Sequence, residues 1–146
     1  MPDNGRRLGA RAIAIGSIVL TLLPACSRPS EPAVTTVDVR ERNFAIDVPA
    51  SVATPGMIDI RVNNRGPSTH EFVVVRTDLP ADQLPIGPDG LSVNEDVLAR
   101  VGEINDLPIW TTRSLELSLT PGRYVFFCNL EGHYLGGMYA SIVVSG

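Results

Sequence analysis

Three residues with soft or borderline donor atoms follow one another at regular spacing near the C-terminus: Cys128, His133 and Met138. They lie at the two ends and the centre of a segment between two predicted strands, residues 123–129 and 139–144. Thiolate, imidazole and thioether groups suit copper better than magnesium, calcium or manganese. The spacing Cys-x4-His-x4-Met therefore predicts a metal site on one loop.

A second imidazole comes from His70, which begins another predicted strand after a turn at residues 63–69. In a two-layer fold, the start of that strand can lie beside the loop. Two His and one Cys with Met as a weak axial donor make a mononuclear blue-copper site. The chain has only two His, and Met57 is predicted to belong to the core. Taken singly, each donor is explained by packing or a surface turn, but the set favours a metal.

These motifs resemble those of the cupredoxins. The resemblance rests on the Cys-x4-His-x4-Met loop after an aromatic strand, and on the upstream pattern Asn-x-Gly followed by His-Glu-Phe-Val-Val. The spacing is that of auracyanin, rusticyanin and sulfocyanin rather than the shorter Cys-x2-His loop of plastocyanin. The resemblance implies one type 1 copper, with the equatorial ligands His70, Cys128 and His133 and the axial ligand Met138.

Two positions beside the first histidine depart from the azurin-like pattern. Glu71 follows His70 where those members have Asn, and Thr69 precedes it where azurin has Gly. The ligand set is complete despite these differences. We expect them to affect the fine geometry of the site and its reduction potential.

The chain after residue 33 has the pattern of short strands. Ile58, Ile60 and Val62 alternate with polar residues, which is the period of a half-buried strand. Turn signals containing Pro and Gly separate the apolar segments. The pattern predicts an all-β Greek-key sandwich. Its predicted strands are residues 34–39, 44–48, 57–63, 70–76, 114–119, 123–129 and 139–144.

Residues 77–112 interrupt this pattern with four prolines and one helix-like stretch, residues 93–101. A connection of this length is either functional or a covering segment. We expect a long crossover that carries one short helix and caps an edge of the sandwich. Trp110, near its end, is expected to be a buried packing residue rather than a ligand platform.

The N-terminus reads as an export signal. Arg6, Arg7 and Arg11 precede an apolar run of twelve residues, which is shorter than the roughly 20 that a spanning helix needs. The sequence Leu-Pro-Ala-Cys26 resembles a bacterial lipobox. We therefore predict a signal peptide at residues 1–25, a lipidated Cys26, a tether at 26–33 and a copper-binding domain at 34–146. A disulfide between Cys26 and Cys128 is the less favoured alternative, and the export route, general or twin-arginine, stays open.

Charge argues against nucleic-acid binding. The formal charge of the chain is −4, and removal of residues 1–25 leaves nine arginines and fifteen acids, or −6. A polyphosphate requires a basic surface instead. Two cysteines among 146 residues also exclude a disulfide-based scaffold.

These features predict a non-enzymatic electron carrier, with no general base or nucleophile expected beside the metal. It would be monomeric, extracytoplasmic and attached to the membrane, with a cytochrome, an oxidase or a copper reductase as donor or acceptor. An apolar patch around His133, formed by Leu130, Tyr134 and Leu135 with Pro67, would receive the partner, although these residues could simply pack over the site. The alternatives are a copper chaperone or storage protein, and a cupredoxin-like partner module of a respiratory complex.

Overall fold

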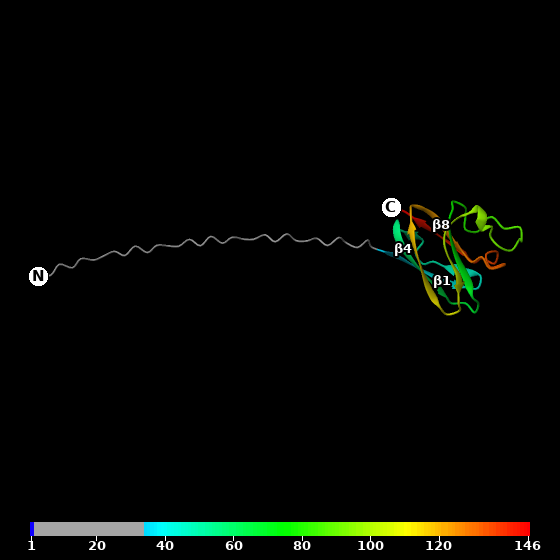
Figure 1. Ribbon diagram of the computed structural model, residues 1–146, viewed down its shortest axis with the longest axis horizontal. Coiled ribbons are helices and arrows are strands. Elements are labelled where there is room, and N and C mark those ends of the chain that lie inside the picture. The colour runs from blue at the N-terminus through cyan, green and yellow to red at the C-terminus, as the bar shows by residue number, and fades with distance from the viewer. Residues whose placement is uncertain (2–33) are drawn as a thin grey trace. The chain divides into compact units, whose positions relative to one another are not determined.

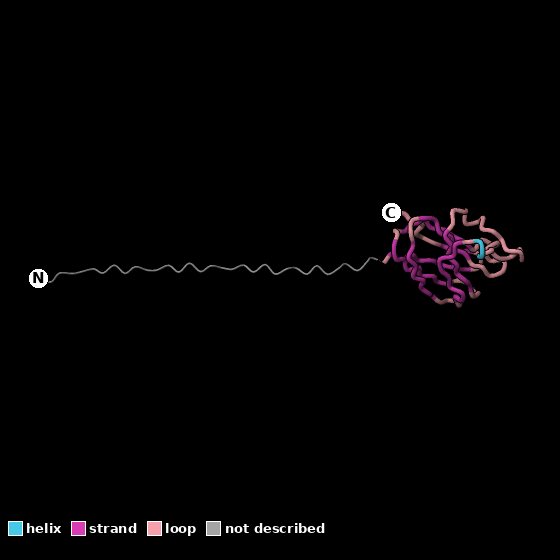
Figure 2. Tube along the Cα trace, turned by 45° about the horizontal axis from the view of Figure 1, so that its top comes forward, coloured by secondary structure: helices cyan, strands magenta, loops and turns pink. Residues whose placement is uncertain are grey.

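The computed structural model describes Met1 and residues 34–146, so the predicted signal peptide, tether and lipidated Cys26 lie outside the described residues. Apart from one short 3-10 helix, all of the regular secondary structure in the described part is β-strand (Figures 1 and 2). Its elements are β1 (Thr35–Arg42), β2 (Ala45–Asp47), β3 (Val52–Ala53), β4 (Gly56–Asn64), β5 (His70–Arg76), the 3-10 turn η1 (Glu95–Val97), β6 (Ala99–Leu107), β7 (Thr112–Leu119), β8 (Gly122–Phe127) and β9 (Tyr139–Val144).

The strands form two sheets, one with the order β2-β1-β4-β7 and the other with the order β3-β9-β8-β5-β6. Both sheets are mixed, because β1 pairs parallel with β4 and β3 pairs parallel with β9, whereas the remaining pairs are antiparallel. The predicted all-β sandwich is thereby confirmed.

The main core lies between the two sheets. Because successive side chains of a strand point to opposite faces, every second residue faces this interior. Ile58, Ile60 and Val62 of β4 are fully buried there, as their alternation predicts. The other sheet contributes Phe72 and Phe126, whose rings pack with their centroids 5.1 Å apart.

A second, smaller core lies on the outer face of the five-stranded sheet. Val75 of β5 and Phe127 of β8 point away from the main core and are covered by Leu84 and Val93. These last two belong to residues 77–98, which we call the covering segment. The predicted covering role is supported, but the segment packs on a face of the sheet rather than on an edge.

The predicted crossover carries one short helix, η1, but this helix covers only three of residues 93–101, and the chain then enters the unpredicted strand β6. Two expectations for individual positions were wrong. Trp110 is 69% exposed and adopts a left-handed backbone conformation with φ of 58°. Met57 is exposed as well, because it lies on the outer face of β4, opposite to that of Ile58.

Among the residues that the structure describes, no helix is long and apolar enough to cross a membrane.

Candidate metal centre

His70 is the first residue of β5 and is completely buried. It shares the inward face of the strand with Phe72 and Val74, which follow it at the strand period. The preceding turn is fixed by Asn64, whose side-chain oxygen accepts the Gly66 N–H at 2.8 Å and whose amide donates to the Ser68 carbonyl at 2.8 Å. The turn that leads into His70 is therefore held in place by the Asn64 side chain.

Cys128 follows β8 directly and continues the inward face of Phe126. Extending the antiparallel register of β5 and β8 by one step places Cys128 opposite Phe72, next to the start of β5. The thiol is fully buried, and the Glu71 N–H donates to its sulfur at 3.4 Å. Two neighbouring strands thus bring Cys128 and His70 together at one end of the sandwich.

The ligand loop, residues 129–138, connects β8 to β9 and is closed by its own hydrogen bonds. The Cys128 N–H donates to the Met138 carbonyl and the Met138 N–H donates to the His133 carbonyl, both at 3.1 Å. Met138 is completely buried in the main core, in the same cluster as Cys128. The loop therefore folds back on itself, with both of its ends at the cysteine.

The three predicted equatorial donors converge. Cys128 Sγ lies 4.0 Å from His70 Nδ1 and 3.4 Å from His133 Nδ1, and the donor atoms of all three residues lie within 4.8 Å of one another. Protein nitrogen and sulfur donors bind a first-row ion such as zinc at about 2.0–2.3 Å. Both sulfur–nitrogen distances can therefore be spanned by one ion, so the donor set fits a metal.

Burial controls the proton affinity of these donors. Desolvation lowers the pKa of His70 to about 4, with a smaller contribution from His133. Desolvation also raises the pKa of the Cys128 thiol to about 11, against the effect of the Glu71 and Leu130 amides. His70 is thus neutral and ready to bind at neutral pH, whereas the thiol must lose a proton to become a ligand.

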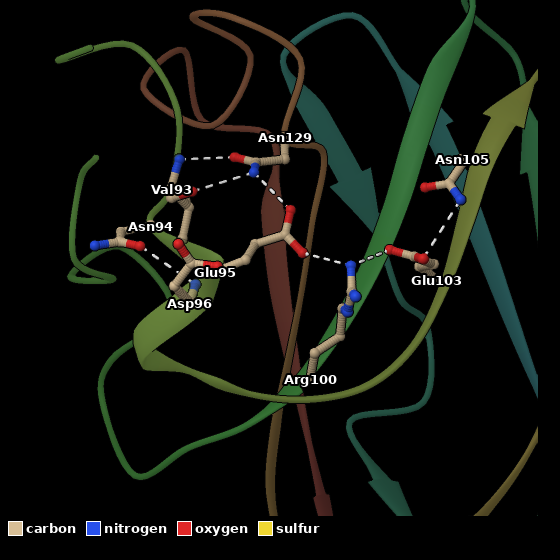
Figure 3. Close-up of polar contacts among 8 residues, drawn as sticks. All are labelled: Val93, Asn94, Glu95, Asp96, Arg100, Glu103, Asn105 and Asn129. Atoms are coloured by element: carbon tan, nitrogen blue, oxygen red, sulfur yellow. Dashed lines mark hydrogen bonds and ion pairs between the residues drawn. The ribbon is translucent and has the colours of Figure 1, made fainter. Parts of the chain in front are cut away.

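The covering segment holds the ligand loop from outside through Asn129, the residue after Cys128 (Figure 3). The Asn129 side chain accepts the Val93 N–H at 2.7 Å and donates to the Val93 carbonyl at 3.2 Å and to Glu95 at 2.7 Å. Glu95 in turn pairs with Arg100 at 3.1 Å. The segment is therefore joined directly to the start of the loop.

Tyr134 makes a second connection between the loop and the covering segment. Its hydroxyl accepts the Leu84 N–H at 2.8 Å and donates to the Ala81 carbonyl at 2.9 Å. Tyr134 is therefore buried in the second core, contrary to its predicted place in an exposed patch. Leu135, by contrast, is 53% exposed beside it.

Phe44 and Asn43, which the sequence analysis did not single out, form the turn between β1 and β2. The Phe44 ring lies edge-on to His133, with ring centroids 5.5 Å apart, and is half exposed. A Cβ on Gly136 would lie only 2.3 Å from this ring, so the loop requires glycine there. The unusual feature of Phe44 is its left-handed backbone conformation, with φ of 62°. This conformation cannot be read from the sequence, so sequence patterns did not point to Phe44.

Glu41 is a second residue that the sequence analysis missed. It follows Val37 and Val39 on the inward face of β1 and is fully buried, and neither carboxylate oxygen has a hydrogen-bond partner among the described residues. Burial raises its pKa to about 8, and its charge contributes to the raised pKa of the Cys128 thiol. A buried carboxyl group therefore lies in the electrostatic environment of the cysteine.

Comparison with protein-family models finds no match, and comparison with curated protein sequences finds none either. Comparison with solved structures finds many. Auracyanin from Roseiflexus castenholzii is 23% identical with a TM-score of 0.60, and the alignment covers 77% of this chain and 98% of that one. Auracyanin A from Chloroflexus aurantiacus, described as a blue copper protein, is 19% identical with a TM-score of 0.57 over 77% and 100% of the two chains.

Rusticyanin from Thiobacillus ferrooxidans is similar at 19% identity and a TM-score of 0.53, over 77% of each chain. At these identities, the likeness concerns the fold. His70, Cys128 and His133 meet at one buried end of two mixed sheets. These sheets have the cupredoxin fold of the auracyanins and rusticyanins.

Proposed function

We propose that this chain is a type 1 copper protein that carries single electrons between redox proteins outside the cytoplasm. The observation that carries the proposal is the convergence of one buried thiol and two imidazoles from separate segments. The similarity in fold to proteins described as blue copper proteins supports it.

His70, Cys128 and His133 would hold the metal as equatorial ligands, and Met138 would be the weak axial donor. Bound copper supplies a centre that gains or loses one electron as Cu(I) or Cu(II). The chain supplies the geometry, because β5, β8 and the closed ligand loop hold the donors close together. A rigid donor set changes little between the two oxidation states, which favours fast electron transfer.

Cys128 also sets a proton requirement for loading. Since its thiol has a pKa of about 11, it is protonated at neutral pH, and metal binding must release that proton. Copper affinity is therefore expected to fall as the pH falls. The buried His70 adds little to this dependence above pH 5, because it is already neutral there.

This donor set fits electron transfer better than catalysis. Four protein donors complete a four-coordinate site and leave no position for a substrate. We further propose a monomer tethered to the outer side of the cell membrane through lipidated Cys26, with a cytochrome, an oxidase or a copper reductase as its partner. His133, half buried beneath Phe44, is the ligand closest to the surface and would face that partner.

The visible spectrum of the full chain after addition of one equivalent of Cu(II) tests the proposal. We expect an intense band at about 600 nm from the Cu(II)–thiolate bond, which ascorbate bleaches and reoxidation restores. Cys128→Ser should abolish the band and retain the fold, whereas the matched variant Cys26→Ser should keep it. A colourless wild-type product would contradict electron carriage. Rapid loss of copper to a mild chelator would favour copper storage or delivery instead.

A further inference from the structure

The second ring nitrogen of His70, Nε2, has no hydrogen-bond partner among residues 34–146. The Nδ1 atom faces the Cys128 sulfur, so Nε2 points away from the donor cluster and is buried. An imidazole that binds a metal through Nδ1 carries its proton on Nε2. A buried N–H without an acceptor is costly, and ligating histidines nearly always donate this proton to a fixed acceptor.

The side-chain oxygen of Asn43 is a hydrogen-bond acceptor in the same situation. It is buried and has no partner within the part of the chain that the structure describes. Asn43 Oδ1 and His70 Nε2 each lie 3.0 Å from the position that a Cβ on Gly66 would occupy, so their separation is at most twice that distance. A side chain at position 66 would press on both atoms, so the glycine there leaves room for them to approach each other.

The orientation of the Asn43 amide is fixed by the other side of the same turn. Its Nδ2 donates to Ser68 Oγ at 3.2 Å, which leaves Oδ1 free to accept. Ser68 is itself held, because its carbonyl accepts the Asn64 amide at 2.8 Å. A buried donor and a buried acceptor therefore lie on either side of one turn whose conformation is held by hydrogen bonds.

We propose that Asn43 is a positioning residue whose side-chain carbonyl accepts the His70 Nε2–H, directly or through one bridging water, and so keeps Nδ1 turned toward Cys128. The link to copper rests on the proposed function, whereas the hydrogen bond itself does not. The turn between β1 and β2 then holds both histidines: Asn43 accepts from His70, and Phe44 packs on His133.

Glu41 is the competing acceptor. Its carboxylate is also buried and unpartnered on the inward face of β1. Asn43 is favoured because its oxygen is among the three atoms nearest to a Cβ on Gly66, together with His70 Nε2, and no Glu41 atom is. The experiment below separates the two residues.

Proton–nitrogen NMR of the 15N-labelled full chain reads the bond directly, first without metal and then with one equivalent of Cu(I). We expect a His70 proton on Nε2 that exchanges slowly with water. Asn43→Ala should accelerate this exchange roughly tenfold, the loss expected for one net hydrogen bond. Asn43→Asp, which keeps an acceptor, should retain the slow exchange. Asn105→Ala, which removes an exposed amide from β6, is the control and should change nothing.

Copper release provides the second measurement, because outer hydrogen bonds of this kind support metal affinity by about 10–100-fold. Asn43→Ala should therefore release copper to a chelator at least about tenfold faster. If Asn43→Ala fails to fold, Ser68→Ala frees the same amide without altering the β1–β2 turn and should weaken the protection in the same direction.

Unchanged exchange of the His70 ring proton in Asn43→Ala would overturn the proposal. Loss of protection in Glu41→Leu, which removes the acceptor, but not in Asn43→Ala would overturn it in favour of Glu41. Because the metal-free chain is measured first, a protein that proves unable to bind copper would leave this result intact, and the two proposals can fail separately.

Discussion

The ring of Phe44 meets the imidazole of His133 edge-on, with 5.5 Å between centroids and an interplanar angle of 65°. Phe44 reaches this position only through a left-handed backbone conformation, with φ of 62°. Side chains other than glycine pay for such a conformation, and strain of this kind is commonly found at functional sites. The contact places an aromatic cover, itself half exposed, over His133, the proposed ligand nearest to the surface.

Phe44→Gly and Phe44→Ala should distinguish the effect of the aromatic ring on copper release from the effect of backbone strain on stability. Both variants remove the ring, so both should release copper to a chelator faster than the wild type. Glycine alone tolerates the left-handed backbone, so Phe44→Gly should be more stable than Phe44→Ala by about 1 kcal/mol in urea unfolding. Equal stability of the two variants would mean that the turn relaxes and that no strain is stored there.

Met138→Leu should raise the reduction potential and keep the blue colour. As the proposed axial donor, the thioether would stabilise Cu(II) weakly, and leucine fills the same buried space without donating. We expect a rise on the order of 60 mV, equivalent to a tenfold change in relative affinity for one electron. Cyclic voltammetry measures it, with Met57→Leu on the exposed face of β4 as the control. An unchanged potential in Met138→Leu would remove Met138 from the ligand set.

Glu41 should make the metal-free protein less stable as the pH rises. Its pKa is about 8 in the folded state and near 4.5 when exposed, so between these values the folded chain holds a proton that the unfolded chain has lost. The free energy of unfolding therefore falls from pH 4.5 to pH 8, by on the order of 4 kcal/mol for this group. Below pH 4.5 both states hold the proton and the penalty is absent.

Glu41→Gln removes this titrating group and keeps the shape of the side chain. Urea unfolding at a series of pH values should show a flatter profile than the wild type and greater stability at pH 8. Glu116→Gln, at an exposed position of β7, should leave the wild-type profile unchanged. A Glu41→Gln profile that parallels the wild type would show that the carboxyl group finds a partner or water in solution.

Tyr134→Phe should loosen the ligand loop without disturbing the sandwich. The change leaves the buried Leu84 N–H and the Ala81 carbonyl without their shared partner, at a cost of about 2 kcal/mol. Amide hydrogen exchange in residues 129–138 should become faster, while exchange in β4 and β5 should not. Tyr139→Phe is the matched control, because Tyr139 packs against Tyr134 but its hydroxyl makes no hydrogen bond within the described residues. Equal effects of the two variants would contradict a specific role for the Tyr134 hydroxyl.

The amino-acid sequence by itself determined the donor types, their spacing and most of the strands. Cys128, His133 and Met138 belong to one loop, so their separation is a local property of the chain. His70 could be added because it starts a strand, which the content of Phe and Val predicted with its observed bounds, His70–Arg76. Ile58, Ile60 and Val62 were predicted to share a buried face because they alternate with polar residues, and all three are buried. Alternation reports burial directly wherever one face of a strand meets the core.

Only the tertiary structure decided what surrounds the donors. Asn43, Phe44 and Glu41 belong to the β1–β2 region, and their distance from the histidines depends on how the sheets pack, which no local pattern encodes. Strand β6 escaped prediction for a related reason: it is an edge strand with mostly exposed residues, so it lacks a regular apolar period. Trp110 and Met57 were misjudged because apolar character predicts burial only where the fold offers a neighbour to pack against.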